Sequence, residues 1–128
     1  MVNIDEATNR LAYKIIGCAY SVHRELGVGL LESAYETCLC YELAKENISC
    51  EKQKELPIMY MGQKLDAGYR IDILVEDTII LELKAVEQLL PIHTAQIMTY
   101  LKLSQKHLGL LINFNHTNLQ NGIRRYVL

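Results

Sequence analysis

Apolar residues in the first part of the chain recur at steps of three and four, the spacing of an amphipathic helix. This pattern predicts a helix over residues 5–26, for which Asp5 or Asn3 is available as the N-terminal cap. A Gly-Val-Gly break at residues 27–29 interrupts the pattern, which then resumes over residues 31–46. The chain is therefore predicted to begin with two consecutive helices.

In the middle of the chain the period of the apolar pattern changes to two, which is typical of β-strands. Turn-forming residues separate β-rich runs at residues 48–54, 57–61, 68–75 and 78–86. These runs predict an antiparallel meander of three or four strands.

Pro91 has the position that proline favours in the first turn of a helix, and the apolar pattern predicts a helix from there to Ser104. Residues 108–114 form a nearly continuous apolar run, typical of a strand covered on both faces, and residues 123–128 predict a short last strand. The order ααβ(β)ββαββ indicates a mixed α/β fold.

The length of 128 residues fits one domain, so we expect residues 1–128 to fold as a single unit. A hydrophobic content of 50% and a charged content of 22% exclude a disordered chain. The net charge of -2 gives no general attraction to nucleic acid, so any phosphate contact must be local. The N-terminus lacks the features of a signal peptide, and we expect a cytoplasmic protein without a membrane partner.

Charged residues interrupt two of the predicted strands. Glu82 and Lys84 share one face of the run 78–86, and Asp72 interrupts the apolar run that precedes it. Such groups are costly to bury unless they are paired, solvated or bound to a cation. A surface ion pair between Glu82 and Lys84 on an edge strand is the simpler alternative, which the presence of Asp72 weakens.

The turn between these strands decides whether the two carboxylates meet. A two-residue loop at Glu76 and Asp77 would pair Asp72 with Leu81, whereas a three-residue loop that includes Thr78 would pair Asp72 with Glu82. We therefore predict a loop of odd length or a bulge.

In that register the two Cβ atoms lie ~5 Å apart, and both carboxylates stay ionised only if a cation lies between them. Oxygen ligands suit Mg²⁺ or Mn²⁺, which also bind substrate phosphate. Lys84 would face the same space, where it could stabilise charge on a phosphorane or help to deprotonate the attacking water. The pattern predicts a hydrolytic centre for phosphate esters.

Asp72, nine intervening residues and then Glu82-Leu-Lys84 resemble the signature of the PD-(D/E)XK nuclease superfamily, although Ile71 stands where the superfamily name has proline. The resemblance implies a restriction-endonuclease-like αβββαβ core, in which helices flank a mixed β-sheet. The helix over residues 5–26 would be an N-terminal addition to that core.

The segment Gly29-Leu-Leu-Glu32-Ser-Ala-Tyr35 resembles the motif of the GxxExxY family within that superfamily, although Val28 replaces an expected proline. By that resemblance Glu32 and the Leu83 carbonyl would join Asp72 and Glu82 in holding one or two metal ions.

The segment Gln96-Ile-Met-Thr-Tyr100 resembles a Q-x-x-x-Y motif of exonuclease-like branches. Gln96 and Tyr100, spaced i and i+4, would share one helix face and position the nucleic acid backbone. His93 would extend the same face over the site, although a structural role is the commoner one for a single histidine.

These features predict a Mg²⁺- or Mn²⁺-dependent nuclease, with DNA as the expected substrate and Asp72, Glu82, Lys84 and Glu32 as candidate catalytic residues. The alternatives are a non-catalytic module that keeps the fold and metal site to bind nucleic acid or a protein, and a phosphatase of small esters. Because a small domain has little surface to grip a duplex, we expect a homodimer or a helper subunit.

Overall fold

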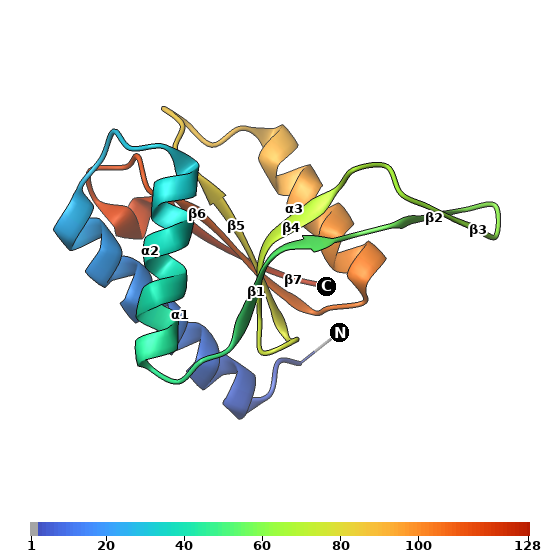
Figure 1. Cartoon of the computed structure of the whole chain (residues 1–128), viewed down its shortest axis with the longest axis horizontal. Helices are drawn as coiled ribbons and strands as arrows, with labels where there is room; N and C mark the ends of the chain where they lie inside the picture. Colours follow the sequence, from blue (N-terminus) through green and yellow to red (C-terminus); the bar gives the residue numbers. More distant parts are fainter. Residues whose placement is uncertain (1–2) are drawn as a thin grey trace.

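The computed structural model describes residues 3–128, in which a five-stranded sheet has helices on both faces (Figure 1). The helices are α1 (Glu6–Leu26), α2 (Glu32–Lys45), α3 (Pro91–Ser104) and a 3-10 helix η1 (Leu119–Gly122). The strands are β1 (Cys50–Glu55), β2 (Ile58–Tyr60), β3 (Gln63–Leu65), β4 (Arg70–Val75), β5 (Ile79–Lys84), β6 (Leu108–Asn113) and β7 (Ile123–Val127).

The sheet has the strand order β1-β4-β5-β6-β7. Strand β4 is antiparallel to both β1 and β5, β6 is parallel to β5, and β7 is antiparallel to β6. Elements α2, β1, β4, β5, α3 and β6 follow one another as the predicted αβββαβ core, with α1 as the N-terminal addition. The predicted fold class is confirmed.

Helix α1 begins where the sequence indicates, and Asp5 rather than Asn3 is its cap. The Thr8 N–H donates to Asp5 Oδ1 at 2.7 Å, which satisfies one of the free donors of the first turn. The helix ends at Leu26, and the following Gly27 has a positive φ of 67°, which glycine adopts without strain.

Two apolar layers enclose the sheet. One lies between the sheet and helices α1 and α2, and it includes Ile15, Leu39 and Phe114; the other lies under α3 and includes Ile97 and Leu101. Every residue of β6 is buried, which confirms a strand covered on both faces. Because helices cover both faces, a charged side chain on a central strand must have specific partners.

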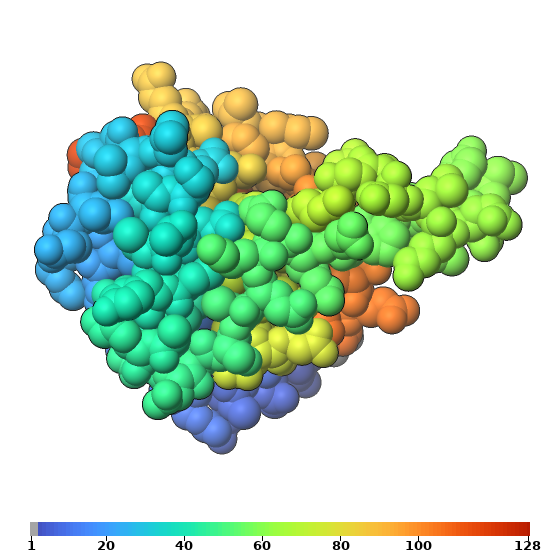
Figure 2. All heavy atoms as spheres, in the orientation of Figure 1, coloured from blue at the N-terminus to red at the C-terminus, as the bar shows by residue number. Residues whose placement is uncertain are grey.

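The prediction that residues 57–61 belong to the meander is wrong. Strand β2 pairs instead with β3, which the sequence pattern did not predict, and the two form a separate hairpin. This β2–β3 hairpin projects from the body of the protein (Figures 1 and 2). Its side chains are mostly exposed and do not pack on the core, so the apolar pattern could not indicate where the hairpin lies.

Among residues 3–128, no helix has both the length and the apolar character that crossing a membrane requires.

Candidate active site

The loop between β4 and β5 has three residues, Glu76 to Thr78. Val75 pairs with Ile79 and Ile73 with Leu81, so the same register places Asp72 opposite Glu82. The prediction of an odd-length loop is confirmed, and the two-residue alternative is excluded.

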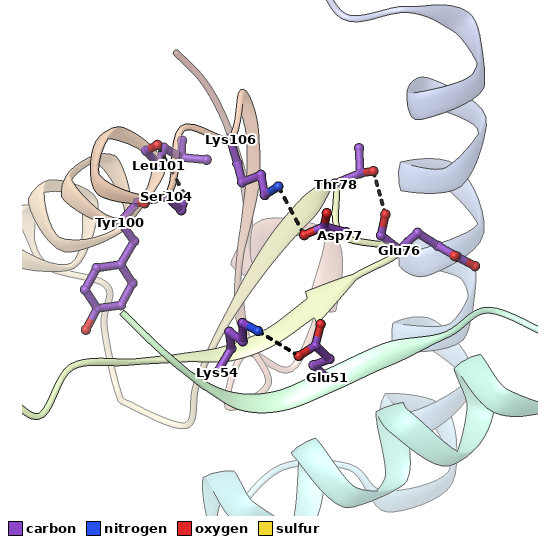
Figure 3. A network of polar contacts seen from close by, with 9 residues as sticks. All are labelled: Glu51, Lys54, Glu76, Asp77, Thr78, Tyr100, Leu101, Ser104 and Lys106. Atoms are coloured by element: carbon purple, nitrogen blue, oxygen red, sulfur yellow. Dashed lines mark hydrogen bonds and ion pairs between the residues drawn. The ribbon is translucent and has the colours of Figure 1, made fainter. Parts of the chain in front are cut away.

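Several polar contacts hold this turn (Figure 3). The Thr78 hydroxyl donates to the Glu76 carbonyl at 2.7 Å, and Lys106 reaches across from the end of α3 to Asp77 at 3.1 Å. The Ser49 N–H and hydroxyl both donate to the Glu76 carboxylate, at 3.1 and 3.0 Å. The turn that sets the register is thus tied to the segments before β1 and after α3.

Asp72 and Glu82 exchange hydrogen bonds with each other's strand. The Asp72 N–H donates to Glu82 Oε2 at 2.9 Å, and the Leu83 N–H donates to Asp72 Oδ2 at 2.8 Å. The recorded backbone pairing of β4 with β5 stops at Ile73 and Leu81. Carboxylates therefore replace the backbone acceptors just where the pairing ends, and this exchange leaves Oδ1 and Oε1 for other ligands.

Strand β1 is also irregular beside Asp72. Pairing of β1 with β4 includes Lys52 with Ile73 and Lys54 with Ile71 but skips Gln53, whose φ is 52°. The Gln53 amide donates to Glu36 Oε2 on α2 at 2.9 Å.

The carboxyl groups of this site are destabilised in their charged form. Burial, with the charge of Asp72 as the next cause, raises the pKa of Glu82 to about 8, although the Asp72 N–H and Lys84 act in the opposite direction. Burial also raises the pKa of Asp72 against the effect of the Leu83 N–H and Lys84, and the charges of Glu36 and Glu32 add to the rise. The combined negative charge of the nearby carboxylates is thus greater than the positive charge that Lys84 supplies.

Glu32 is close enough to influence both carboxyls electrostatically. Across residues 3–128, however, no three side chains of His, Cys, Asp or Glu are gathered closely enough to form a metal cluster. The structure thus brings Asp72 and Glu82 together and leaves Glu32 at the margin. Glu36, one helical turn after Glu32, lies on the same side of α2; that spacing was the signal by which the sequence could have identified it.

Gln96 and Tyr100 lie on one face of α3, as their spacing predicted. The Gln96 amide donates to the Tyr100 hydroxyl at 3.1 Å. Burial raises the pKa of Tyr100, and the next cause is the charge of Glu82, which places the phenol near the carboxylates. His93 accepts a hydrogen bond from the Leu90 N–H at 3.0 Å and so helps to begin α3.

The sequence model of the PD-(D/E)XK nuclease superfamily matches residues 9–126. The chain belongs to this superfamily. No match was found among curated proteins or among solved structures. The matched region includes the β4–β5 hairpin and both helices that approach it.

Members of the superfamily generally use divalent metal ions, and the donor chemistry here fits such an ion. Asp72 and Glu82 each have a second carboxylate oxygen, the type of ligand that Mg²⁺ and Mn²⁺ prefer. The raised pKa of each carboxyl group indicates that added positive charge would be stabilised between them.

Tyr35, the last residue of the helical motif, has a structural role in this superfamily member. Its hydroxyl donates to the Gly27 carbonyl at 2.7 Å and accepts from the Leu30 N–H at 3.3 Å. Its ring stacks on Phe114 with the centroids 4.6 Å apart. Tyr35 therefore fixes the loop that precedes Glu32.

Asn113 was not identified from the sequence, although a polar residue within an apolar run is a usable signal. Its side chain accepts from the Val86 N–H at 3.1 Å and donates to the Val86 carbonyl at 2.9 Å, while the Phe114 N–H donates to the Lys84 carbonyl at 2.8 Å. A Cβ at Gly122 would lie 2.4 Å from the Asn113 carbonyl oxygen, so only glycine fits there. These contacts fix the backbone that carries Lys84.

Proposed function

We propose that this protein is a metal-dependent nuclease that hydrolyses phosphodiester bonds of DNA, within the GxxExxY branch of its superfamily. The supporting observation is the pair of hydrogen bonds that link Asp72 on β4 to Glu82 and Leu83 on β5, the strand that also carries Lys84. These hydrogen bonds hold the buried Glu82 carboxylate and the half-buried Asp72 carboxylate side by side, with Lys84 as a positively charged neighbour.

Asp72 and Glu82 would hold Mg²⁺ or Mn²⁺, with the Leu83 carbonyl as a further ligand. Glu32 would join through water, because Mg²⁺ usually keeps several of its waters. When bound, such an ion neutralises phosphate charge and makes water more acidic.

The other residues would act on the substrate. The Lys84 ammonium would bind a phosphate oxygen and stabilise the charge that develops on it. Gln96 and Tyr100 would position the nucleic acid backbone through the amide and hydroxyl that already contact each other. A dimer or a helper subunit would supply the surface that a chain of 128 residues lacks for gripping a duplex.

The test is cleavage of end-labelled single- and double-stranded DNA with Mn²⁺. We expect cleavage by the wild type, its loss in EDTA, and a reduction of roughly 100-fold or more in Asp72→Asn and Lys84→Ala. Glu51→Gln is the matched control, because Glu51 is an exposed carboxylate on β1 that pairs with Lys54.

Absence of cleavage by the wild type, or undiminished cleavage by Lys84→Ala, would contradict the proposal. Calorimetric Mn²⁺ binding that is lost in Asp72→Asn without cleavage of any polymer would favour the non-catalytic module. Release of phosphate from small nucleotides alone would favour the phosphatase.

A further inference from the structure

A pocket of about 520 Å³ lies between α3 and the base of the β2–β3 hairpin. Ile58 and Tyr69, at the two ends of the projecting hairpin segment, form one wall, and Gln96 and Thr99 from α3 belong to the other. Lys84 also lines the pocket. The pocket therefore adjoins the candidate active site.

The lining of this pocket combines flat, apolar and hydrogen-bonding surfaces. The Tyr69 side chain packs edge-on against Tyr100, with ring centroids 6.1 Å apart, and remains 43% exposed. Ile58, Ile92 and Leu103 add apolar surface. A cavity of this size, lined by apolar and aromatic side chains with a few polar groups, is typical of sites for small ligands, and the Tyr69 ring offers a flat surface to them.

The charges around the pocket select among such ligands. Lys84 is positively charged and no Asp or Glu side chain is among the described lining residues, so the Lys84 end is the part of the lining that suits an anionic group, although Asp72 and Glu82 lie near Lys84 outside the lining. A ligand with a planar, polar-edged ring and an adjacent negative charge matches both parts. A nucleotide within a strand has that composition, because its base is joined through the sugar to a phosphate.

We propose that the pocket receives one unstacked nucleobase of a single strand whose phosphate lies at Lys84. This inference rests on the proposed function and adds a substrate class to it. A base inside a duplex is paired and stacked, and extracting it requires energy. The site is therefore selective for single strands and frayed ends, and aromatic stacking of the base on Tyr69 accepts any base.

Binding measured without cleavage tests the pocket separately from the reaction. Fluorescein-labelled dT12 and rU12 are compared, in EDTA, with strands of the same charge in which the central bases are replaced by abasic sites. We expect the strand with all its bases to bind roughly tenfold more tightly than its abasic counterpart. The DNA and RNA strands show which sugar is preferred.

Two pocket variants and one control complete the design. Tyr69→Ala removes the stacking surface, and Ala95→Trp fills the pocket from an exposed position on α3; both bring the ratio of the two affinities towards one. Tyr41→Ala removes a tyrosine that is 66% exposed on α2 and leaves the ratio unchanged.

Equal binding of both strands by the wild type overturns the pocket inference, and so does an unchanged ratio in both pocket variants. Cleavage by the wild type in either case leaves the proposed nuclease intact. A base-dependent affinity that only the two pocket variants lose supports the pocket even in a protein that cuts nothing.

Discussion

The β4–β5 and β2–β3 hairpins are both antiparallel pairs but have different surroundings. Ile73, Val75, Ile79 and Leu81 are fully buried between helical layers, whereas Met59 and Tyr60 on β2 are each 61% exposed. In the first hairpin, burial makes any misplaced charge costly, so its carboxylates have defined partners. In the second hairpin the side chains are exposed and can contact a ligand. Whether helices cover a hairpin therefore decides whether it can hold buried carboxylates or present exposed side chains to a ligand.

The largest contrast is expected from truncating one apolar side chain in each hairpin. Ile73→Ala should lower the free energy of unfolding by about 2–5 kcal/mol, because it leaves a cavity in a packed layer. Met59→Ala should change it by less than ~0.5 kcal/mol. Urea unfolding followed by circular dichroism measures both, and similar losses in the two variants would refute the contrast.

The next effect concerns the charge inside the buried hairpin. The pKa of Glu82 is about 8 in the folded state, above its ordinary value of 4.5. Between these values the folded protein keeps a proton that the unfolded chain releases, so wild-type stability falls as pH rises from about 5 to 8. Asp72 acts in the same direction.

Glu82→Gln removes this titration, so its stability relative to the wild type should increase by on the order of 2 kcal/mol from pH 5 to pH 8. Urea unfolding in EDTA at several pH values measures the difference, with Glu51→Gln as the exposed control. A constant difference between Glu82→Gln and the wild type across this range would show that Glu82 is not protonated on folding.

The smallest effect is expected at the turn that sets the register. Lys106→Ala removes the ion pair with Asp77 and should cost up to about 1 kcal/mol, because Asp77 is largely exposed. Lys102→Ala changes an exposed lysine of α3 and is the matched control. The loss should shrink in high salt, and equal unfolding midpoints for the two variants would show that the pair does not stabilise the turn.

Much of the β4–β5 hairpin could be predicted from the sequence. Burial imposes an alternating apolar pattern, and only one register of the two strands places Asp72 opposite Glu82. The αβββαβ order followed from the same patterns. Strand β3 was missed because its residues are exposed and therefore show no apolar alternation. Its partner β2 was expected as a strand within residues 57–61, but the sequence pattern did not indicate which strand it pairs with.

The missing parts of the site depend on contacts between distant residues. Gln53 meets Glu36 across the gap between β1 and α2, and neither residue interrupts an apolar pattern. The motif spacing identified Tyr35 but not its role, since only the structure shows its hydroxyl bonded within the 27–30 loop. Asp72 and Glu82, which disturb a buried pattern, were found, although Asn113, which does the same in β6, was overlooked. The residues that meet at the surface left no such pattern.

The exchange between Asp72 and Glu82 has a consequence for how related chains should be judged. Each carboxylate accepts a backbone hydrogen bond beyond the point where the recorded strand pairing stops. Selection for folding alone would then preserve a hydrogen-bond acceptor at each of these two positions, which an Asn or Gln side chain also supplies, in a descendant that no longer performs any reaction. The presence of such acceptors in a relative is evidence of shared architecture, whereas Lys84, for which no side-chain hydrogen bond or ion pair is recorded within residues 3–128, is the better marker of retained chemistry.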